Sequence, residues 1–165
     1  MPRERESLQK LYLEQLRDLY SAEEQILEAL PKMVDKATHA ELKRGFQTHY
    51  QQTEQHRERL DQLFEMLGEE SGGHTCKGMK GLLAEGEETM KEFKDSDVLD
   101  AALIAAAQRV EHYEMAGYGC ARTYASLLGL DEHARTLQRT LDEEGETDHK
   151  LTDLAETVIN IDAMK

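Results

Sequence analysis

The sequence predicts an all-α protein, an antiparallel four-helix bundle whose long middle connection carries a short extra helix. The chain of 165 residues contains only 2 prolines and no tryptophan, and it is rich in Leu, Ala, Glu, Gln, Lys and Arg, which favour helices. Apolar residues recur at steps of three and four, the spacing of a buried helix face. Strand patterns are missing, and residues 1–165 are expected to form a single domain.

The first helix is predicted over residues 7–36, with Glu23 at the centre of its apolar seam. Pro31 lies inside this pattern and has no backbone N–H, so a kink or an irregular turn is expected there. The remaining seam residues are Leu13, Leu16, Tyr20, Leu27, Leu30 and Val34.

The second helix is predicted to begin at a capping box formed by Thr38 and Glu41 and to end at Gly68. Its seam is apolar at both ends and polar in the middle. The seam residues are Leu42, Phe46, His49, Thr53, His56, Leu60, Leu63 and Leu67.

An antiparallel return around Thr38 sets the register between the first two helices. Residues whose numbers sum to twice 38 lie level, so Glu23 is expected beside Thr53. The polar residues within about one turn of that level are His49, Gln52 and His56.

The crossover begins with a loop over residues 69–75, and Thr75 is predicted to cap a short helix over residues 76–93. This segment returns the chain to the end of the bundle where the first helix starts. The third and fourth helices are predicted to be capped by residues 95–97 and by Asp131. One long middle connection of this kind is a known bundle topology.

Two acids interrupt the apolar seam of each of the last two helices. They are Glu111 and Glu114 in the third helix, and Glu144 and Asp148 in the fourth. If these helices fold back around residues 128–131, positions whose numbers sum to about 259 lie level. The four carboxylates are therefore expected to meet at one depth, at the level of Glu23.

Five acids, with His49 and His56 nearby, are thus expected in the middle of the bundle. Unit charges about 4 Å apart repel by roughly 4 kcal/mol at an effective dielectric near 20, so the acids cannot all stay ionised unaided. Protons, Arg or Lys, or metal ions could neutralise them. The four seams contain no Lys or Arg, although Arg17 and Arg109 lie beside them. Divalent cations are favoured, and carboxylates with imidazoles suit iron or manganese. The other five histidines lie off the seams and are expected to face solvent.

The third helix also carries a second apolar stripe, and a face this wide needs a cover. The stripe consists of Leu99, Leu103, Ala106, Val110, Tyr113 and Gly117. The short helix or a second copy of the chain could cover it, and we expect a homodimer.

The formal net charge of −14 argues against a nucleic-acid partner, because phosphate contacts need clustered Lys and Arg. No apolar run approaches the roughly 20 residues of a membrane span, and the first six residues do not have the pattern of a signal peptide. Cys76 and Cys120 are too few for a disulfide framework. We therefore expect no membrane association and a cytoplasmic location.

Several strings spread over nearly the whole chain resemble the YciE/YciF-type group of ferritin-like stress proteins. They are residues 19–25, 101–114, 141–144, 147–148 and 150–153. The resemblance implies a ferritin-like bundle, commonly dimeric, with a non-haem di-iron centre. It also implies stress-related roles.

The wider rubrerythrin-like pattern assigns ligand roles to matching residues. Glu23 corresponds to the Glu of the first helix, and Glu111 and Glu114 to the Glu-x-x-Glu of the third. In the fourth helix Glu144 matches, while Thr147 and Asp148 replace the last two ligands.

The second helix departs from the pattern of this group. Where the group has His-x-x-Glu-Thr, this chain has His49, Gln52 and Thr53, so the expected bridging carboxylate is a neutral amide. His56 lies one turn further on and can compensate. A mononuclear or asymmetric site therefore remains an alternative to a di-iron site.

Two hypotheses follow. In the first, the protein holds two iron ions per chain, with manganese as a variant, and oxidises Fe(II) with O2 or H2O2. In the second, it is a non-enzymatic, stress-induced helical dimer that acts as a scaffold or binding protein and has a degraded or mononuclear metal site.

Overall fold

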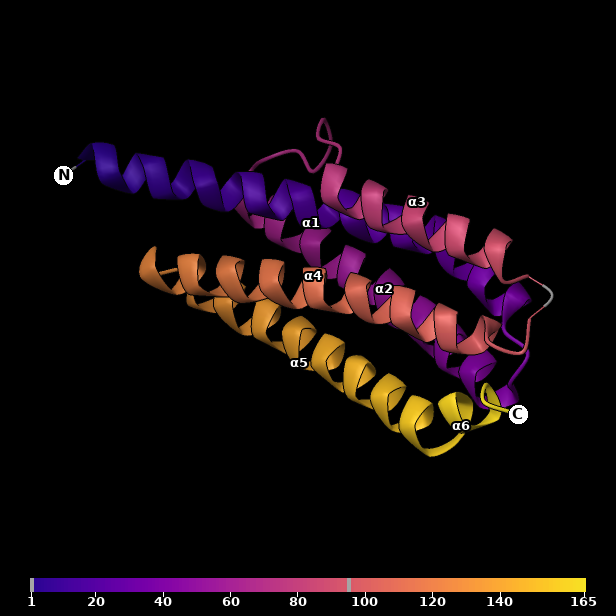
Figure 1. Ribbon diagram of the computed structural model, residues 1–165. Helices are drawn as coiled ribbons and strands as arrows, with labels where there is room; N and C mark the ends of the chain where they lie inside the picture. Colours follow the sequence, from indigo (N-terminus) through magenta and orange to yellow (C-terminus); the bar gives the residue numbers. More distant parts are fainter. Residues whose placement is uncertain (1, 95) are drawn as a thin grey trace.

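The computed structural model describes residues 2–94 and 96–165, and this part of the chain is helical without a strand (Figure 1). Four long helices build the bundle: α1 (Pro2–Lys36), α2 (Ala40–Leu67), α4 (Leu99–Leu127) and α5 (Asp131–Leu154). The short helix α3 (Lys77–Glu92) lies in the crossover, and a π-helical segment, η1 (Ala155–Ile159), leads into α6 (Asn160–Asp162). The predicted fold class and the helix in the crossover are confirmed.

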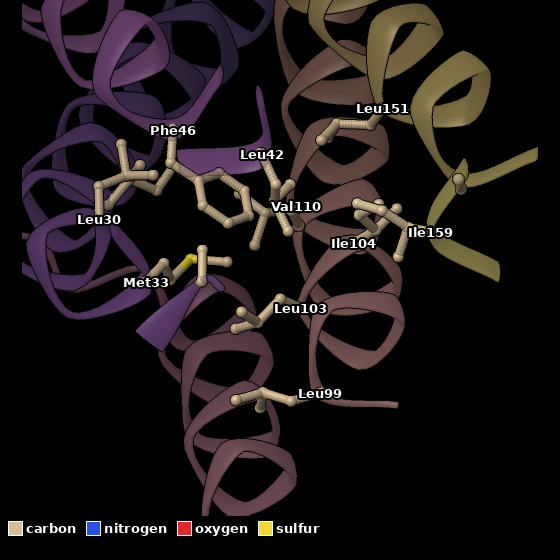
Figure 2. Packing of buried hydrophobic residues seen from close by; sticks show 14 of the residues in the cluster. Leu30, Met33, Leu42, Phe46, Leu99, Leu103, Ile104, Val110, Leu151 and Ile159 are labelled. Atoms are coloured by element: carbon tan, nitrogen blue, oxygen red, sulfur yellow. The ribbon is translucent and has the colours of Figure 1, made fainter. Parts of the chain in front are cut away.

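Two apolar clusters fill the bundle, one on each side of a polar layer. One cluster includes Leu30, Phe46 and Leu103, whose packing Figure 2 shows. It also includes Ala37 and Leu42, so it lies toward the end where α1 turns into α2. The other includes Leu16 and Leu63 and lies toward the opposite end. Burying a large apolar side chain stabilises the folded state by about 1.5–3 kcal/mol. The two clusters therefore offset the cost of burying polar groups between them.

The buried faces of α2 and α4 follow the predicted seams, but the face of α1 is rotated. The seam predicted for α1 included Leu13, Tyr20 and Leu27, which are only half-buried, whereas Tyr12, Leu19 and Ile26 are buried. The predicted face and the observed face of α1 both carry apolar residues, so periodicity alone does not show which of the two is buried. The helix also continues through Pro31 to Lys36, without the irregular turn predicted there.

The start of α2 is held by a residue of another helix. Its N-cap is His39, which makes no side-chain capping bond, so the predicted capping box of Thr38 and Glu41 is wrong. Instead, Asp100 of α4 accepts hydrogen bonds from Thr38 N at 2.8 Å, Thr38 Oγ1 at 2.6 Å and His39 N at 2.9 Å. At the other end Gly68 has φ 67°, and the predicted helix end there is confirmed.

Three other predicted caps are wrong. Cys76, not Thr75, caps α3, because its Sγ accepts a backbone N–H of the first turn at 3.3 Å. Residues 95–97 were expected to cap the next helix; residue 95 lies outside the described residues, and the N-cap is Val98. Asp131 is the first residue of α5 rather than its cap, and there its negative charge still suits the helix dipole.

The short helix α3 covers the second apolar stripe of α4. The two helices approach closely at Gly78, where a Cβ would lie 2.6 Å from the ring of Tyr113. Residues of one chain therefore cover this stripe, α3 at Ala106 and Tyr113 and Leu19 of α1 at Gly117, and the homodimer remains a prediction. Among the described residues, no helix is both long and apolar enough to span a membrane.

Candidate metal centre

Four acids meet inside the bundle at the level of the polar layer. Glu23 of α1, Glu111 and Glu114 of α4, and Glu144 of α5 are each at most 1% exposed. Two histidines of α2 complete the layer, His49 at 4% and His56 at 1% exposed. These six residues therefore meet at the level that the antiparallel register predicted.

The six side chains form two groups that share one residue. Glu23, His56, Glu114 and Glu144 form the first group, which we call group 1, and His49, Glu111 and Glu144 form group 2. Within each group one possible ligand atom per residue lies within 4.8 Å of all the others. Ligands on opposite sides of a metal ion at about 2.1 Å lie about 4.2 Å apart, so only small side-chain shifts separate this arrangement from coordination.

Each histidine lies within 3.5 Å of one or two carboxylates of its group. His49 Nε2 lies 2.9 Å from Glu111 Oε1. His56 Nδ1 lies 2.7 Å from Glu144 Oε1 and 3.5 Å from Glu23 Oε1. These contacts neutralise part of the negative charge.

The histidines do not satisfy the hydrogen-bonding capacity of the cluster. Among the described residues, both oxygens of Glu114 and both of Glu144 have no hydrogen-bond partner, although His56 Nδ1 is only 2.7 Å from one of them. One oxygen each of Glu23 and Glu111 is also unpartnered. A buried carboxylate without a partner costs several kcal/mol, so unpartnered oxygens converging at two points fit the geometry that bound cations require.

A second layer of residues orients the possible ligands. His56 Nε2 lies 2.8 Å from Glu143 Oε2, and Arg59 holds both oxygens of Glu143 at 2.8 and 3.0 Å. With a proton on Nε2 that donates to Glu143, Nδ1 presents a lone pair toward group 1. Tyr118 donates a hydrogen bond of 2.5 Å to Glu23 Oε1. The role of Glu143 was not predicted from the sequence, because this residue lies off the seam.

The pKa of each of the two histidines is raised above its ordinary value. Burial acts to lower the pKa of His49, but the Glu111 carboxylate outweighs it and raises the pKa to about 9. Burial acts in the same direction on His56, where Glu144 and Glu23 raise the pKa to about 10. A metal ion that bound to these nitrogens would therefore have to displace protons.

The carboxyl groups divide into two kinds. Burial and the neighbouring acids raise the pKa of Glu111 and of Glu114 well above the ordinary value. Burial would also raise the pKa of Glu144, but the close approach of Glu111 and His56 lowers it instead. Glu144, the residue that both groups share, therefore keeps its negative charge most readily.

Two of the predicted site residues lie outside these groups. The carboxylate of Asp148 accepts a hydrogen bond from Gln108 Nε2 at 3.1 Å and lies 3.1 Å from His112 Nε2, on the flank of α4. One further turn along α5 thus carries this side chain out of the polar layer. Gln52 is half-buried, and its Oε1 accepts a hydrogen bond from Thr147 at 3.3 Å.

One histidine is buried against expectation. His133 was expected to face solvent, but it is 3% exposed, and its Nδ1 lies 2.8 Å from the hydroxyl of Tyr12. This pair lies toward the opposite end of the bundle from α6, away from both groups. His133 is buried because it packs against Tyr12 of α1, and the periodicity of α5 alone cannot indicate such a contact.

Comparison with known proteins places this chain among proteins of similar length. Residues 7–164 match the family described as "Domain of unknown function (DUF892)". The chain is 40% identical over 155 residues to Protein YciF of Escherichia coli (strain K12), with 93% of each protein covered. These similarities confirm the resemblance to the YciE/YciF-type group.

Solved structures agree with this placement. The crystal structure of the E. coli stress protein YciF matches with a TM-score of 0.88 and 40% identity, over 93% of this chain and 97% of that chain. YcfI, described as a putative structural protein from Rhodopseudomonas palustris, matches with a TM-score of 0.85 and 45% identity, over 88% and 92% of the two chains. The fold described above is therefore the fold of these relatives.

Proposed function

The chain belongs to the DUF892 family, and we propose that it is a non-haem metal protein that binds two iron ions per chain and oxidises Fe(II) with O2 or hydrogen peroxide. The observation that carries this proposal is the set of buried, unpartnered carboxylate oxygens that converge in two groups sharing Glu144. Such a set is costly in a dry interior unless cations stabilise it.

The charge balance supports two cations rather than one. Group 1 and group 2 together contain four carboxylates, which carry four negative charges when ionised. Two divalent ions bring four positive charges, and the two imidazoles are neutral when they act as ligands. The centre is then neutral without any contribution from lysine or arginine.

The protein side chains bind and orient, while the metal supplies the redox chemistry. When bound, a pair of Fe(II) ions supplies the two electrons that convert one hydrogen peroxide and two protons into two water molecules. Glu144 belongs to both groups and would be shared by the two ions, while Glu143 and Tyr118 would keep His56 and Glu23 in place. The apolar clusters on both sides limit the access of bulk water.

Carboxylates with imidazoles are also compatible with manganese, so the metal itself has to be identified by experiment. The stress-protein description of E. coli YciF agrees with a role in limiting oxidative damage, which we propose for this chain as well. We propose a cytoplasmic location, and in a reducing cytoplasm Fe(II) is the oxidation state that the protein would meet.

A second candidate function is a helical scaffold with no turnover. The description of the R. palustris relative as a putative structural protein favours it. The neutral amide of Gln52, beside group 2, also favours it, because it adds no charge that would hold a second cation. In this alternative, protonated His49 and His56 balance two of the four acids, and Glu111 and Glu114, whose pKa values are raised, hold protons of their own.

Iron titration separates the two functions. Metal-free protein is titrated with Fe(II) under anaerobic conditions, hydrogen peroxide is then added, and Fe(III) formation and peroxide loss are followed. We expect saturation near two Fe(II) per chain and one peroxide consumed per two Fe(II). Binding of fewer than about 0.2 Fe(II) per chain, with no oxidation above the rate of free iron, would establish the scaffold instead.

Variants on α5 make this test specific to the centre. Glu144→Gln removes the carboxylate that both groups share. Asp148→Asn removes a carboxylate one turn away that lies outside both groups. We expect the first variant to lose Fe(II) binding and oxidation and the second to keep both. Equal activity in the two variants would contradict the assignment.

A further inference from the structure

A cavity of about 270 Å³ lies between the long helices and reaches inward to the level of the candidate metal centre. The exposed residues Glu41 and Gly45 of α2 and Lys150 of α5 line its outer part, so it opens to solvent between these two helices. His49 and Glu111, two members of group 2, line its inner part and are 4% and 1% exposed. The cavity therefore connects the surface with one side of group 2.

The body of this cavity is apolar. Figure 2 shows two of its side chains, Phe46 and Val110, facing one another between the helices. The other apolar residues of the lining include Leu30, Met33, Leu42 and Leu151. An apolar molecule gains free energy by leaving water for such a space, whereas a water molecule there lacks most of the about two to four polar partners that it needs.

The inner end of the cavity offers few hydrogen bonds to an occupant. Both nitrogens of His49 and Oε2 of Glu111 are buried, so they lie behind the surface that faces the cavity. Beside them, Thr147 Oγ1 donates a hydrogen bond to Gln52 Oε1 at 3.3 Å, and these two side chains thus bond to each other. An occupant of the inner end needs no polar group of its own.

These walls distinguish between the two oxidants of the proposed function. Dioxygen is small, uncharged and apolar, so it partitions from water into the cavity. Hydrogen peroxide carries two hydroxyl groups, and each is unfavourable in apolar surroundings without a hydrogen bond. Peroxide has a polar approach elsewhere, because the side chain of Glu143 is 22% exposed and its Oε2 lies 2.8 Å from His56 Nε2 of group 1.

We propose that this cavity takes up dioxygen and delivers it to group 2. The last step crosses only the side chains of His49 and Glu111, which are themselves possible ligands. One O2 takes up two electrons, supplied by two Fe(II), and two protons from solvent, and it leaves as one hydrogen peroxide. The volume corresponds to about nine water-sized groups at about 30 Å³ each, so the cavity holds O2 in reserve. This inference rests on the proposed function and names its oxidant.

Xenon tests the cavity without metal or turnover, because this apolar gas enters apolar cavities as O2 does. Crystals of the metal-free, full-length protein are pressurised with xenon. We expect an anomalous peak inside the cavity, in contact with Phe46, Val110 and Leu151. The absence of a peak there would overturn the proposal. Saturable binding of hexanoate at the same residues, with a Kd below about 1 mM by NMR, would also overturn it, since the cavity would then be a site for an amphiphile.

Two glycines provide a matched pair of variants. A Cβ added at Gly45 or at Gly81 meets nothing within 4 Å, and phenylalanine has a higher helix propensity than glycine, so both phenylalanine variants are expected to fold. Gly45 lies at the mouth of the cavity, and Gly81 lies on α3 outside it. A phenyl ring at the mouth closes the apolar route and leaves O2 to cross the close-packed interior.

The two variants are loaded anaerobically with Fe(II) and mixed with O2 or with hydrogen peroxide. We expect Gly45→Phe to lose the xenon peak and to slow oxidation by O2 at least about tenfold, while oxidation by peroxide keeps the wild-type rate. Gly81→Phe should match the wild type in all three measurements. An unchanged O2 rate in Gly45→Phe, or equal slowing with both oxidants, would overturn the proposal.

Failure of this inference and failure of the proposed function have different signatures. Anaerobic Fe(II) binding is measured on the same preparations. Fe(II) binding and oxidation by peroxide, without a xenon peak, would keep the metal protein and reject the O2 route. A xenon peak without Fe(II) binding would reject the metal protein and, with it, the delivery of O2.

Discussion

Replacement of Glu144 by glutamine is the substitution with the largest expected effect, because Glu144 is the one residue that belongs to both groups. The amide keeps the size of the side chain, and the position is 0% exposed, so packing changes little. What changes is one negative charge and one anionic oxygen ligand at each of two metal positions.

The magnitude follows from the environment of this carboxylate. Substitutions of residues that only support a metal ligand cost about 10–100-fold in affinity, so loss of a shared ligand should cost more than about 100-fold at each position, or about 2.8 kcal/mol. In the metal-free protein the amide also removes the negative charge that lies 2.7 Å from His56 Nδ1. This charge helps to raise the pKa of His56, and each unit by which that pKa falls lowers the free energy of unfolding at neutral pH by about 1.4 kcal/mol.

The assay is calorimetric titration with Fe(II) under anaerobic conditions, together with urea unfolding of the metal-free protein. Asp148→Asn is the control, since its carboxylate bonds to Gln108 and His112 instead of either group. Wild-type iron affinity in the Glu144→Gln variant would refute the reasoning, and so would an equal loss in the control.

Three further predictions concern the surroundings of the centre. Glu143→Gln should weaken metal binding about 10–100-fold by releasing His56, as measured by the same titration; unchanged affinity would contradict this role. The metal-free protein should lose stability as pH rises from about 6.5 to 10. In this range the two buried histidines, with pKa values raised to about 9 and about 10, keep protons that the unfolded chain has released. Denaturant unfolding across this pH range measures the effect, and rising stability would contradict the prediction. Asp100→Asn should cost about 1–2 kcal/mol in urea unfolding by weakening the bonds to residues 38 and 39 at the start of α2, and it should leave metal content unchanged.

Much of the candidate centre could be predicted because acidic residues occupy seam positions where apolar residues are expected. The seams of α2 and α4 have a clear period, and the polar positions within them, such as His49, Glu111 and Glu114, proved to be buried. Antiparallel register then placed Glu23 and Glu144 at the same level. Short connections make such arithmetic reliable, because few residues separate the paired helices.

The rest depends on contacts between helices that no single helix reveals. Asp148 continues the predicted seam of α5, yet its side chain points to the flank of α4, because a straight helix drifts away from a fixed seam. Glu143 lies off the seam, and its role requires Arg59 of another helix to hold it beside His56. Likewise, Asp100 caps α2 from a distance of about sixty positions in the sequence, beyond the reach of local capping rules.

The most direct test of the account is an anomalous-difference map at the iron edge from crystals loaded anaerobically with Fe(II). The account predicts two peaks per chain, one among Glu23, His56, Glu114 and Glu144 and one among His49, Glu111 and Glu144. The absence of any peak inside the bundle, with the same side chains closed on one another through hydrogen bonds, would contradict it.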